Sequence, residues 1–429
     1  MTAAEPALPD PDNRLRRSLG VGDAVVIGLG SMLGAGIFAA LAPAAQAAGA
    51  GLLIGLAVAA VLAYCNATSS ARLAALYPAS GGTYVYGRER LGEFWGFLAG
   101  WGFVVGKTAS CAAMALTVGW YAWPAHAHAV AVMAVVGLTA VNYVGVTKAA
   151  WLTRVIVVTV LLALACVVGS VFSSGAGNFA NLSLSGDVHG TGVLQSAGFL
   201  FFAFAGYARI ATLGEEVRDP VRTIPRAIVT ALALTLVVYA AVATAVLSAL
   251  GPQRLAATAS PLTDAVRAAG ATWLPPVIAV AAVLAALGSL LSLLLGVSRT
   301  TLAMARDRHL PGLLDAVHPR FRVPHRAELT VAALAALLAA TVDLRGAIGF
   351  SSFAVLVYYA IANASALTLR REEGAPAKVI PVVGFSGCAL VALALPWSSI
   401  IAGAGVLTVG ALLFWGRRLV RRRSRGPTD

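Results

Sequence analysis

Charged residues are scarce in this chain of 429 residues. Asp, Glu, Lys and Arg together make up 11% of it, whereas soluble domains carry about 25%. Apolar residues make up 59%, and the mean hydropathy is +0.83. A soluble fold cannot bury that much apolar surface, so the composition argues against a cytosolic enzyme or a nucleic-acid binder. It predicts an all-α protein that crosses a membrane several times.

The residue types that metal and redox chemistry require are also few. The four cysteines lie singly in apolar stretches without any CxxC pair, which argues against a disulfide framework or a zinc knuckle. The six histidines fall in loops or near the ends of apolar stretches. No acid lies deep in such a stretch, because Asp23 and Glu328 are near the ends. We therefore expect no metal site and no cofactor.

Apolar stretches of about 20 residues, enough for a helix to cross roughly 30 Å of hydrocarbon, follow a polar segment at 1–20. That segment lacks a cleavable apolar region, so we interpret it as a cytoplasmic tail. We predict twelve transmembrane helices, at 24–46, 52–76, 94–121, 129–147, 151–172, 191–210, 227–250, 273–298, 327–343, 347–369, 379–396 and 398–416.

The distribution of Lys and Arg predicts the orientation. Twelve spans put both termini on one side, and the loops of the other side hold only Arg254, Arg267 and Arg345. Lys107 lies inside the third span, and the remaining cations lie at or near the side of the termini. This bias predicts cytoplasmic termini in the cytoplasmic membrane. Contact with anionic lipid also accounts for the net charge of +13, so we expect the lipid bilayer, and no nucleic acid, as a partner.

Two predicted spans contain glycines in their middle. The first has four glycines in the nine positions 28–36, and the sixth has Gly206 among the small and aromatic residues of 202–207. Glycine costs a helix about 1 kcal/mol relative to alanine, and unwound backbone at membrane depth is tolerated only where it lines a cavity. Close helix packing through small residues is the alternative. Paired interruptions at corresponding places of two halves favour the midplane site of a secondary transporter.

Such interruptions suit a zwitterionic ligand. The N-terminus of a half-helix presents unpaired N–H groups to an anion such as a carboxylate. Freed carbonyls and the C-terminus of a half-helix suit an ammonium group or a small cation. An α-amino acid carries both groups on one carbon, so we expect an amino acid substrate.

Three motifs resemble those of the amino acid–polyamine–organocation (APC) permeases. Residues 34–38, Gly-Ala-Gly-Ile-Phe, are similar to the family's G-[ST]-G-I-F signature. Residues 201–225, FFAFAGYARIATLGEEVRDPVRTIP, resemble its aromatic break followed by paired acids and a basic loop. Residues 288–311, GSLLSLLLGVSRTTLAMARDRHLP, resemble its eighth span and exit. The resemblance covers nearly the whole chain.

The resemblance implies an inverted five-plus-five fold with broken helices 1 and 6. The repeats would occupy 21–172 and 191–369, followed by two extra helices at 379–416 and a basic cytoplasmic tail at 417–429. The substrate site would lie between the two broken helices. The residues that it would comprise are Ser31, Met32, Leu33, Gly34, Ala35, Gly36, Ile37, Phe202, Ala203, Phe204, Ala205 and Tyr207.

The same resemblance assigns roles within that set. Met32, Ala35, Gly36 and Ile37 would surround the carboxylate, and Ala35 lacks the hydroxyl donor of the usual Ser or Thr. The ammonium group would meet Phe202, Ala203 and Ala205, and either Phe202 or Tyr207 would act as a thin gate.

A substrate with a cationic side chain would need a carboxylate in the pocket, and the sequence has no acid deep in a predicted span. This absence favours a neutral amino acid. An acidic substrate stays open, since Lys107 and Arg209 lie near the relevant depth, and a cationic amino acid or polyamine is the remaining alternative. A charge at the position of Lys107 costs about 2.5–3.5 kcal/mol. Lys107 is therefore either a coupling residue or a structural lysine that snorkels or binds carbonyls.

Four other residues are coupling or gate candidates. Some proton-coupled relatives carry a lysine on the fifth span, where this chain has Thr159. Arg209 could pair with Glu215 or Glu216 as a gate, or form an ordinary interfacial pair. Ser289 and Ser292 could bind sodium, although serine in such a helix more often bonds its own backbone. Tyr358 and Tyr359 are expected to pack rather than to line the pocket.

We therefore predict a secondary active transporter that moves an amino acid by alternating access, coupled to protons or by exchange. A membrane-embedded enzyme is the rival from another class, but it would need converging His, Asp, Glu or Cys residues at membrane depth, which the sequence lacks. A channel is a third alternative, although an occluded site of zwitterion size suits binding and release better. The oligomeric state is not indicated.

Overall fold

The computed structural model describes residues 19–424 except 78–80, 145–149, 185–188 and 212–216. Helices dominate the described residues, and no β-sheet is present among them. The helices are α1 (Val21–Met32), α2 (Ala35–Ala39), α3 (Leu41–Ala48), α4 (Leu52–Leu76), α5 (Thr83–Leu91), α6 (Glu93–Ala122), α7 (Ala127–Tyr143), α8 (Ala150–Ser173), α9 (Gly190–Phe204), α10 (Ala208–Ala211), α11 (Pro220–Ala257), α12 (Pro261–Ala268), α13 (Leu274–Arg306), α14 (His325–Thr341), α15 (Leu344–Leu367), α16 (Val379–Ala394) and α17 (Trp397–Ser424).

Membrane-crossing length is reached by nine helical segments within the described residues. The other three predicted spans correspond to α9, α14 and α16, which are shorter, at 15, 17 and 16 residues. The multi-pass helical class is therefore confirmed. The count of twelve spans stays a prediction, because these three helices fall below the length that crosses the hydrocarbon unaided.

Several element boundaries differ from those predicted. Helix α5 lies in a segment interpreted as a loop, because its charged residues hide a short helix that begins after Gly82 at a φ of 56°. Helix α11 extends past the predicted end at 250, with Gly251 at a φ of 70° forming a kink. Helix α12 lies between α11 and α13, where only a loop was expected.

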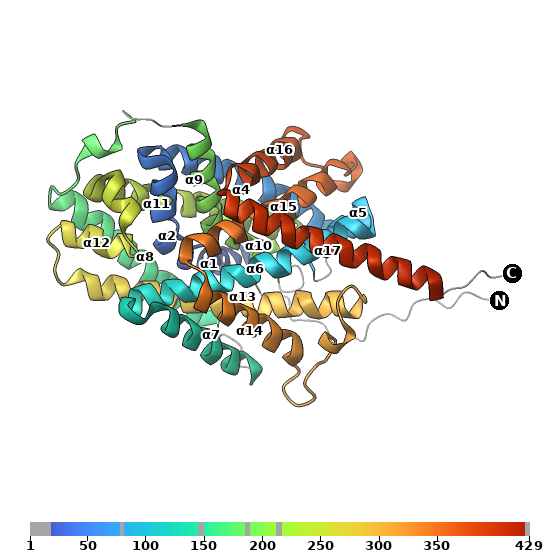
Figure 1. The fold of residues 1–429 in the computed structure, drawn as a ribbon. Helices are drawn as coiled ribbons and strands as arrows, with labels where there is room; N and C mark the ends of the chain where they lie inside the picture. Colours follow the sequence, from blue (N-terminus) through green and yellow to red (C-terminus); the bar gives the residue numbers. More distant parts are fainter. Residues whose placement is uncertain (1–18, 78–80, 145–149, 185–188, 212–216, 425–429) are drawn as a thin grey trace.

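Both glycine-containing spans are interrupted where the sequence changes to small residues. Helix α1 ends at Met32, Leu33 and Gly34 leave helical geometry, and α2 begins at Ala35. Ala40 keeps helical dihedral angles, so α2 and α3 continue in nearly one direction. Helix α9 ends at Phe204, and a 3-10 turn at Ala205–Tyr207 leads into α10. In Figure 1 these segments lie in the middle of the bundle.

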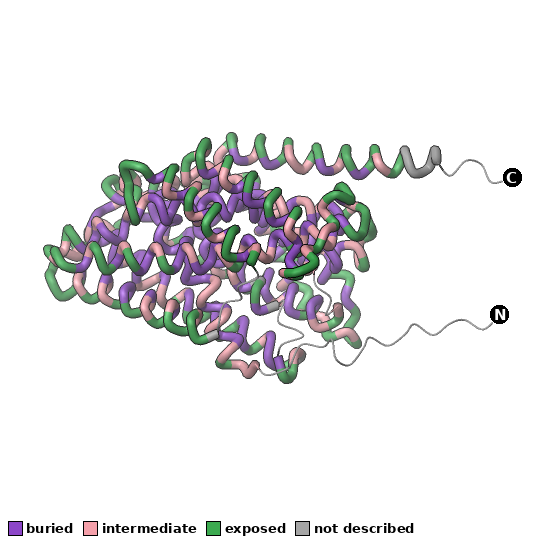
Figure 2. Tube along the Cα trace, turned by 90° about the horizontal axis from the view of Figure 1, so that it is seen from below, coloured by how far each residue is buried: buried purple, intermediate pink, exposed green. Residues whose placement is uncertain are grey.

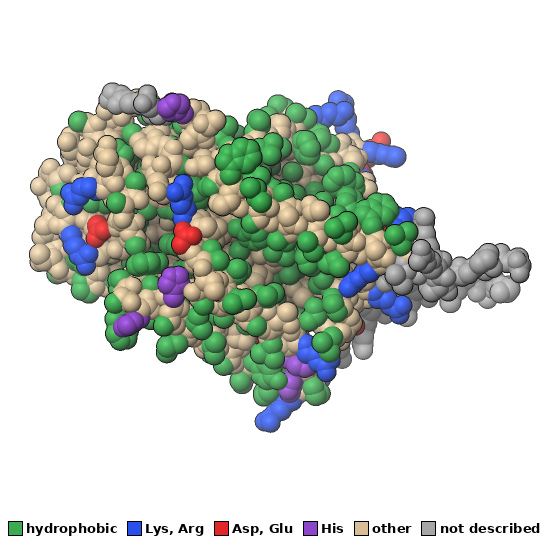
Figure 3. All heavy atoms as spheres, viewed as in Figure 1, with side chains coloured by type: hydrophobic (Ala, Val, Ile, Leu, Met, Phe, Trp, Pro, Cys, Tyr) green, Lys and Arg blue, Asp and Glu red, His purple; other side chains and the backbone are tan. Residues whose placement is uncertain are grey.

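The outward faces of the helices are apolar. Figure 2 shows buried positions concentrated inside the bundle and exposed ones along its outer faces. Many exposed positions carry large apolar side chains, such as Met133, Leu162 and Ile401, which are 72%, 62% and 68% exposed. In Figure 3 apolar side chains cover the middle of the visible face, whereas Lys and Arg lie mainly towards its two ends. This surface is one that hydrocarbon, rather than water, solvates.

A buried polar network joins α15 to α4. Asn363 Nδ2 donates to Asn66 Oδ1 at 2.6 Å, and the Ser69 hydroxyl donates to Asn363 Oδ1 at 2.7 Å. All three residues are fully buried. Polar side chains that bond across helices hold membrane bundles together, because lipid offers no alternative partner.

We expect Asn363→Ala to lower the melting temperature of the purified protein, by removing both interhelical bonds at a cost of about 1–3 kcal/mol. The control is Ser386→Ala on α16, whose exposed hydroxyl bonds only its own helix. Equal melting temperatures for the two variants would show that the network does not stabilise the bundle.

Candidate functional site

The two interruptions contact each other through their backbones. A Cβ atom on Gly206 would lie 2.3 Å from the carbonyl oxygen of Ser31 and 2.7 Å from the nitrogen of Met32. A Cβ atom on Gly36 would lie 2.4 Å from the Cα of Ala203. Real Cβ atoms do not come this close to a neighbouring backbone, so glycine is required at both positions. The glycines therefore bring two segments that are far apart in the chain into direct contact.

Tyr239 of α11 connects both interruptions. Its hydroxyl lies within hydrogen-bond distance of the carbonyl of Met32, the last residue of α1, and 3.2 Å from the carbonyl of Ala203, near the end of α9. Helix ends leave carbonyls without intrahelical partners, and this tyrosine, which is 1% exposed, has one O–H that can donate to either of them from the side. Tyr239 was not predicted from the sequence, because a tyrosine in an apolar span resembles ordinary packing.

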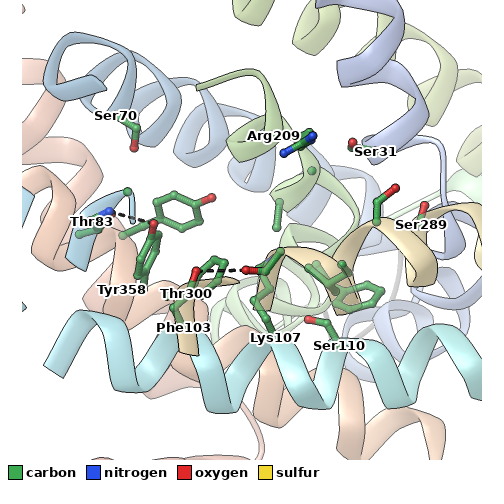
Figure 4. Close-up of a pocket in the computed structure, with 18 of the residues that line it drawn as sticks. Ser31, Ser70, Thr83, Phe103, Lys107, Ser110, Arg209, Ser289, Thr300 and Tyr358 are labelled. Carbon is green, nitrogen blue, oxygen red and sulfur yellow. Dashed lines mark hydrogen bonds between the residues drawn. The ribbon is translucent and has the colours of Figure 1, made fainter. Parts of the chain in front are cut away.

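A cavity of about 180 Å³ borders the interruptions. Since one water needs roughly 10–15 Å³ by this measure, a solute of about ten heavy atoms would fit. The cavity is lined by residues of α1, α4, α5, α6, α9, α10, α13 and α15 together with the 3-10 turn. It runs from Ser31 and Gly206 to Gly82 and Thr83 at the start of α5. Figure 4 shows this lining.

Seven of the predicted site residues line the cavity. They are Ser31, Phe202, Ala205, Lys107, Arg209, Ser289 and Ser292. The structure thus brings together residues of five helices that the sequence analysis had assigned to one site or to its coupling and gate.

The other predicted site residues are packed behind the lining instead. Gly36 packs on Ala203, and a Cβ on Gly34 would meet the Ser289 hydroxyl at 2.0 Å. Ala35 is fully buried against Val118 and Ala286. The remaining ones outside the lining are Met32, Leu33, Ile37, Phe204 and Tyr207, which are buried, and Thr159, which is half-buried on α8. The small residues at 34–36 let α9 and α13 approach the first interruption closely, which leaves no cavity space beside them.

The aromatic pair of α15 faces the cavity, although packing alone was expected. Tyr358 and Tyr359 both line it, and the Tyr358 hydroxyl accepts a hydrogen bond of 3.0 Å from the backbone N–H of Thr83. The ring of Tyr359 lies 5.4 Å from that of Tyr207. Sequence reasoning also missed Ser70, Phe103, Ser110 and Thr300. Their polar or aromatic character on spans two, three and eight was the only signal available.

The cavity has cations but no acid among its described lining residues. Lys107 of α6 is 8% exposed, and no hydrogen bond or ion pair joins it to the described part of the chain. Arg209 enters from α10, on a different wall from Lys107 (Figure 4). Glu215 and Glu216, the gate partners predicted for Arg209, lie outside the described residues.

The serines of α13 are engaged with backbone carbonyls. Ser292 donates to the carbonyl of Gly288 in its own helix at 3.1 Å, and Ser289 donates to that of Gly30 at 3.5 Å. The second bond ties α13 to α1 next to the interruption. Among the described residues, no group of three or more His, Cys, Asp or Glu could hold a metal ion.

Helices α2 and α6 are joined next to the first interruption. The Tyr121 hydroxyl of α6 donates to the carbonyl of Phe38 in α2 at 3.1 Å, and the two rings meet edge to face at 5.7 Å. Neither residue is among those that line the cavity. A solute-sized cavity at two contacting helix interruptions, inside a helical bundle with an apolar surface, is the arrangement of a membrane permease.

The comparisons with known proteins agree with this class. Residues 23–417 match the family model described as amino acid permease. An uncharacterised transporter of Mycobacterium tuberculosis is 70% identical over 97% of this chain and 94% of its own length. A branched-chain amino acid permease of Bacillus subtilis is 26% identical over 94% of this chain and 93% of its own length. The human cationic amino acid transporter 4 is 29% identical over 85% of this chain and 61% of its own length.

The chain therefore belongs to the amino acid permease family, within the APC superfamily. It is a transporter with membrane-spanning helices and not an enzyme. The resemblance read from the three sequence motifs is thereby confirmed.

Proposed function

We propose that this protein is a secondary active transporter that moves an amino acid across the cytoplasmic membrane by alternating access, with both termini in the cytoplasm. The observation that carries the proposal is the cavity at the contact between the two helix interruptions. With the predicted orientation, its extension to α5 is the cytoplasmic path. The twelve-span inverted repeat, with α1–α2 and α9–α10 as its broken helices, is part of this proposal.

The backbone of the substrate binds at the interruptions. Phe202 and Ala205 in the lining, with the carbonyl of Ala203 behind them, take the ammonium group. The N–H groups around Met32, Ala35, Gly36 and Ile37 take the carboxylate, because a helix start leaves donors unpaired. Gly36 packs on Ala203, so α2 must separate from α9 for these N–H groups to reach the substrate. Phe202 acts as the thin gate.

The lining argues against a cationic side chain, since no described lining residue is acidic. The sequence favours a neutral side chain and leaves an acidic one open. The names of the relatives include branched-chain and cationic amino acids, so similarity does not choose among substrates. For coupling, we propose a proton gradient or exchange, as predicted from the sequence. Serine in such a helix more often bonds its own backbone than a cation, and Ser292 does so here.

Reconstitution into liposomes tests this function. We expect saturable uptake of a radiolabelled amino acid, and an inward pH gradient or a preloaded amino acid should accelerate it. Replacing sodium by choline should leave the rate unchanged, because the proposed coupling does not use sodium. Saturable uptake of a nucleobase, with no amino acid transported, would contradict the proposal.

A further inference from the structure

Lys107 cannot reach the membrane surface along its helix. It lies 14 residues from Glu93 and 15 from Ala122, the two ends of α6. At 1.5 Å per residue, each end is about 21 Å away, which is farther than a lysine side chain extends. The snorkelling alternative is therefore wrong for this geometry. Lys107 lines the cavity near the interruptions instead.

Within the part of the chain that the structure describes, no negative charge lies next to Lys107. No described residue of the lining is acidic, and no described side chain or carbonyl bonds to it. One helical turn farther along α6, the Ser110 hydroxyl is paired with that of Ser351 at 2.5 Å. Ionisable groups inside a membrane are costly unless they pair, and they mark substrate or ion sites.

A further buried polar group of the lining, the hydroxyl of Ser70, has no hydrogen-bond partner within the described part of the chain. Ser70 is 5% exposed. Its hydroxyl can donate a hydrogen bond, as can Lys107. Buried polar groups are normally paired, so this set of donors indicates that an acceptor-rich ligand group completes the site. A carboxylate accepts several hydrogen bonds and carries a negative charge that can pair with the ammonium group of Lys107.

We infer that the cavity binds an amino acid with a second carboxylate, which pairs with Lys107, so that the substrate class is the acidic amino acids. This inference rests on the proposed function, in which the α-amino and α-carboxylate groups are held at the interruptions. The sequence favoured a neutral substrate, because it revealed the lack of acids and the depth of Lys107 but not that Lys107 lines the cavity.

Matched ligands test the inference. Glutamate and glutamine, or aspartate and asparagine, differ in charge but hardly in shape. Each would be offered to the full-length protein in proteoliposomes as a competitor for uptake, and to the purified protein in a thermal-shift assay. We expect the wild type to prefer each acid over its amide by at least about tenfold, as one charge-assisted bond at a desolvated site provides.

Substitutions connect the preference to Lys107. Lys107→Met keeps the length without the charge, and should remove the preference by weakening the acid while leaving the amide nearly unchanged. Lys107→Arg keeps the charge and should retain part of the preference. Lys378→Met, on an exposed residue at the start of α16 and outside the cavity, is the control and should match the wild type.

The possible results distinguish a failure of the acidic-substrate inference from a failure of the proposed function. Uptake of neutral amino acids without preference for an acid, or a preference that survives in Lys107→Met, overturns the inference and leaves the proposed function standing. Failure of all amino acids to bind or to be transported overturns the proposed function as well. If Lys107→Met does not fold, the wild-type ratio of acid to amide and the behaviour of Lys107→Arg decide.

Discussion

Gly206→Ala should reduce the initial rate of amino acid uptake at least about tenfold. The new Cβ would lie 2.3 Å from the Ser31 oxygen and 2.4 Å from its carbonyl carbon. Both atoms belong to the backbone, so no flexible side chain can move aside, and overpacking of this kind costs about 1–3 kcal/mol. Relief requires α1 and the 3-10 turn to separate at the substrate site. Uptake into proteoliposomes at equal protein content measures the effect.

Gly137→Ala is the matched control. Gly137 lies in α7 with no atom within 4 Å of its hypothetical Cβ, so the same substitution should leave uptake at the wild-type level. A Gly206→Ala protein that transports normally would show that the contact between the interruptions is dispensable for transport.

Tyr239→Phe should both destabilise the protein and slow transport. The substitution keeps the ring, which packs edge to face on Phe204 at 5.1 Å, and removes only the hydroxyl between the carbonyls of Met32 and Ala203. At least one buried carbonyl then loses its partner, at a cost of about 1–3 kcal/mol. The two interruptions also lose their common attachment to α11.

The measurements are the melting temperature in detergent and the uptake rate. Tyr64→Phe serves as the control, since Tyr64 is 45% exposed on the outer face of α4. Wild-type values of both quantities for Tyr239→Phe would mean that the carbonyls find other partners, and that the hydroxyl has no role in holding the site.

The helical membrane class and the two interruptions could be predicted because their causes are local. Hydropathy over a stretch of about 20 residues identifies a span. A glycine cluster such as that at 28–36 weakens a helix wherever it stands in the fold. The break at Leu33 and Gly34 lies within the predicted stretch. Short elements such as α5 escaped, because a charged helix of nine residues has no hydropathy signal.

The composition of the cavity could be predicted only in part. Lys107 and Phe202 were expected near the site and do line it, whereas Ala35 and Gly36 were expected there and are packed behind it. In a water-soluble helix, polar and apolar faces reveal which side points inward. A membrane helix is apolar towards lipid and towards its neighbours alike, so the pattern does not distinguish lipid, neighbouring helix and cavity.

Local sequence was thus enough to establish that this chain is a helical membrane protein with two weakened spans, and its motifs indicated the permease family. Three features depended on how the helices pack. These are the backbone contact between Gly206 and Ser31, the double role of Tyr239, and the placement of Lys107 in a cavity whose described lining residues include no acid. Each joins segments far apart in the chain, so it exists only once packing has chosen which face of each helix meets which neighbour.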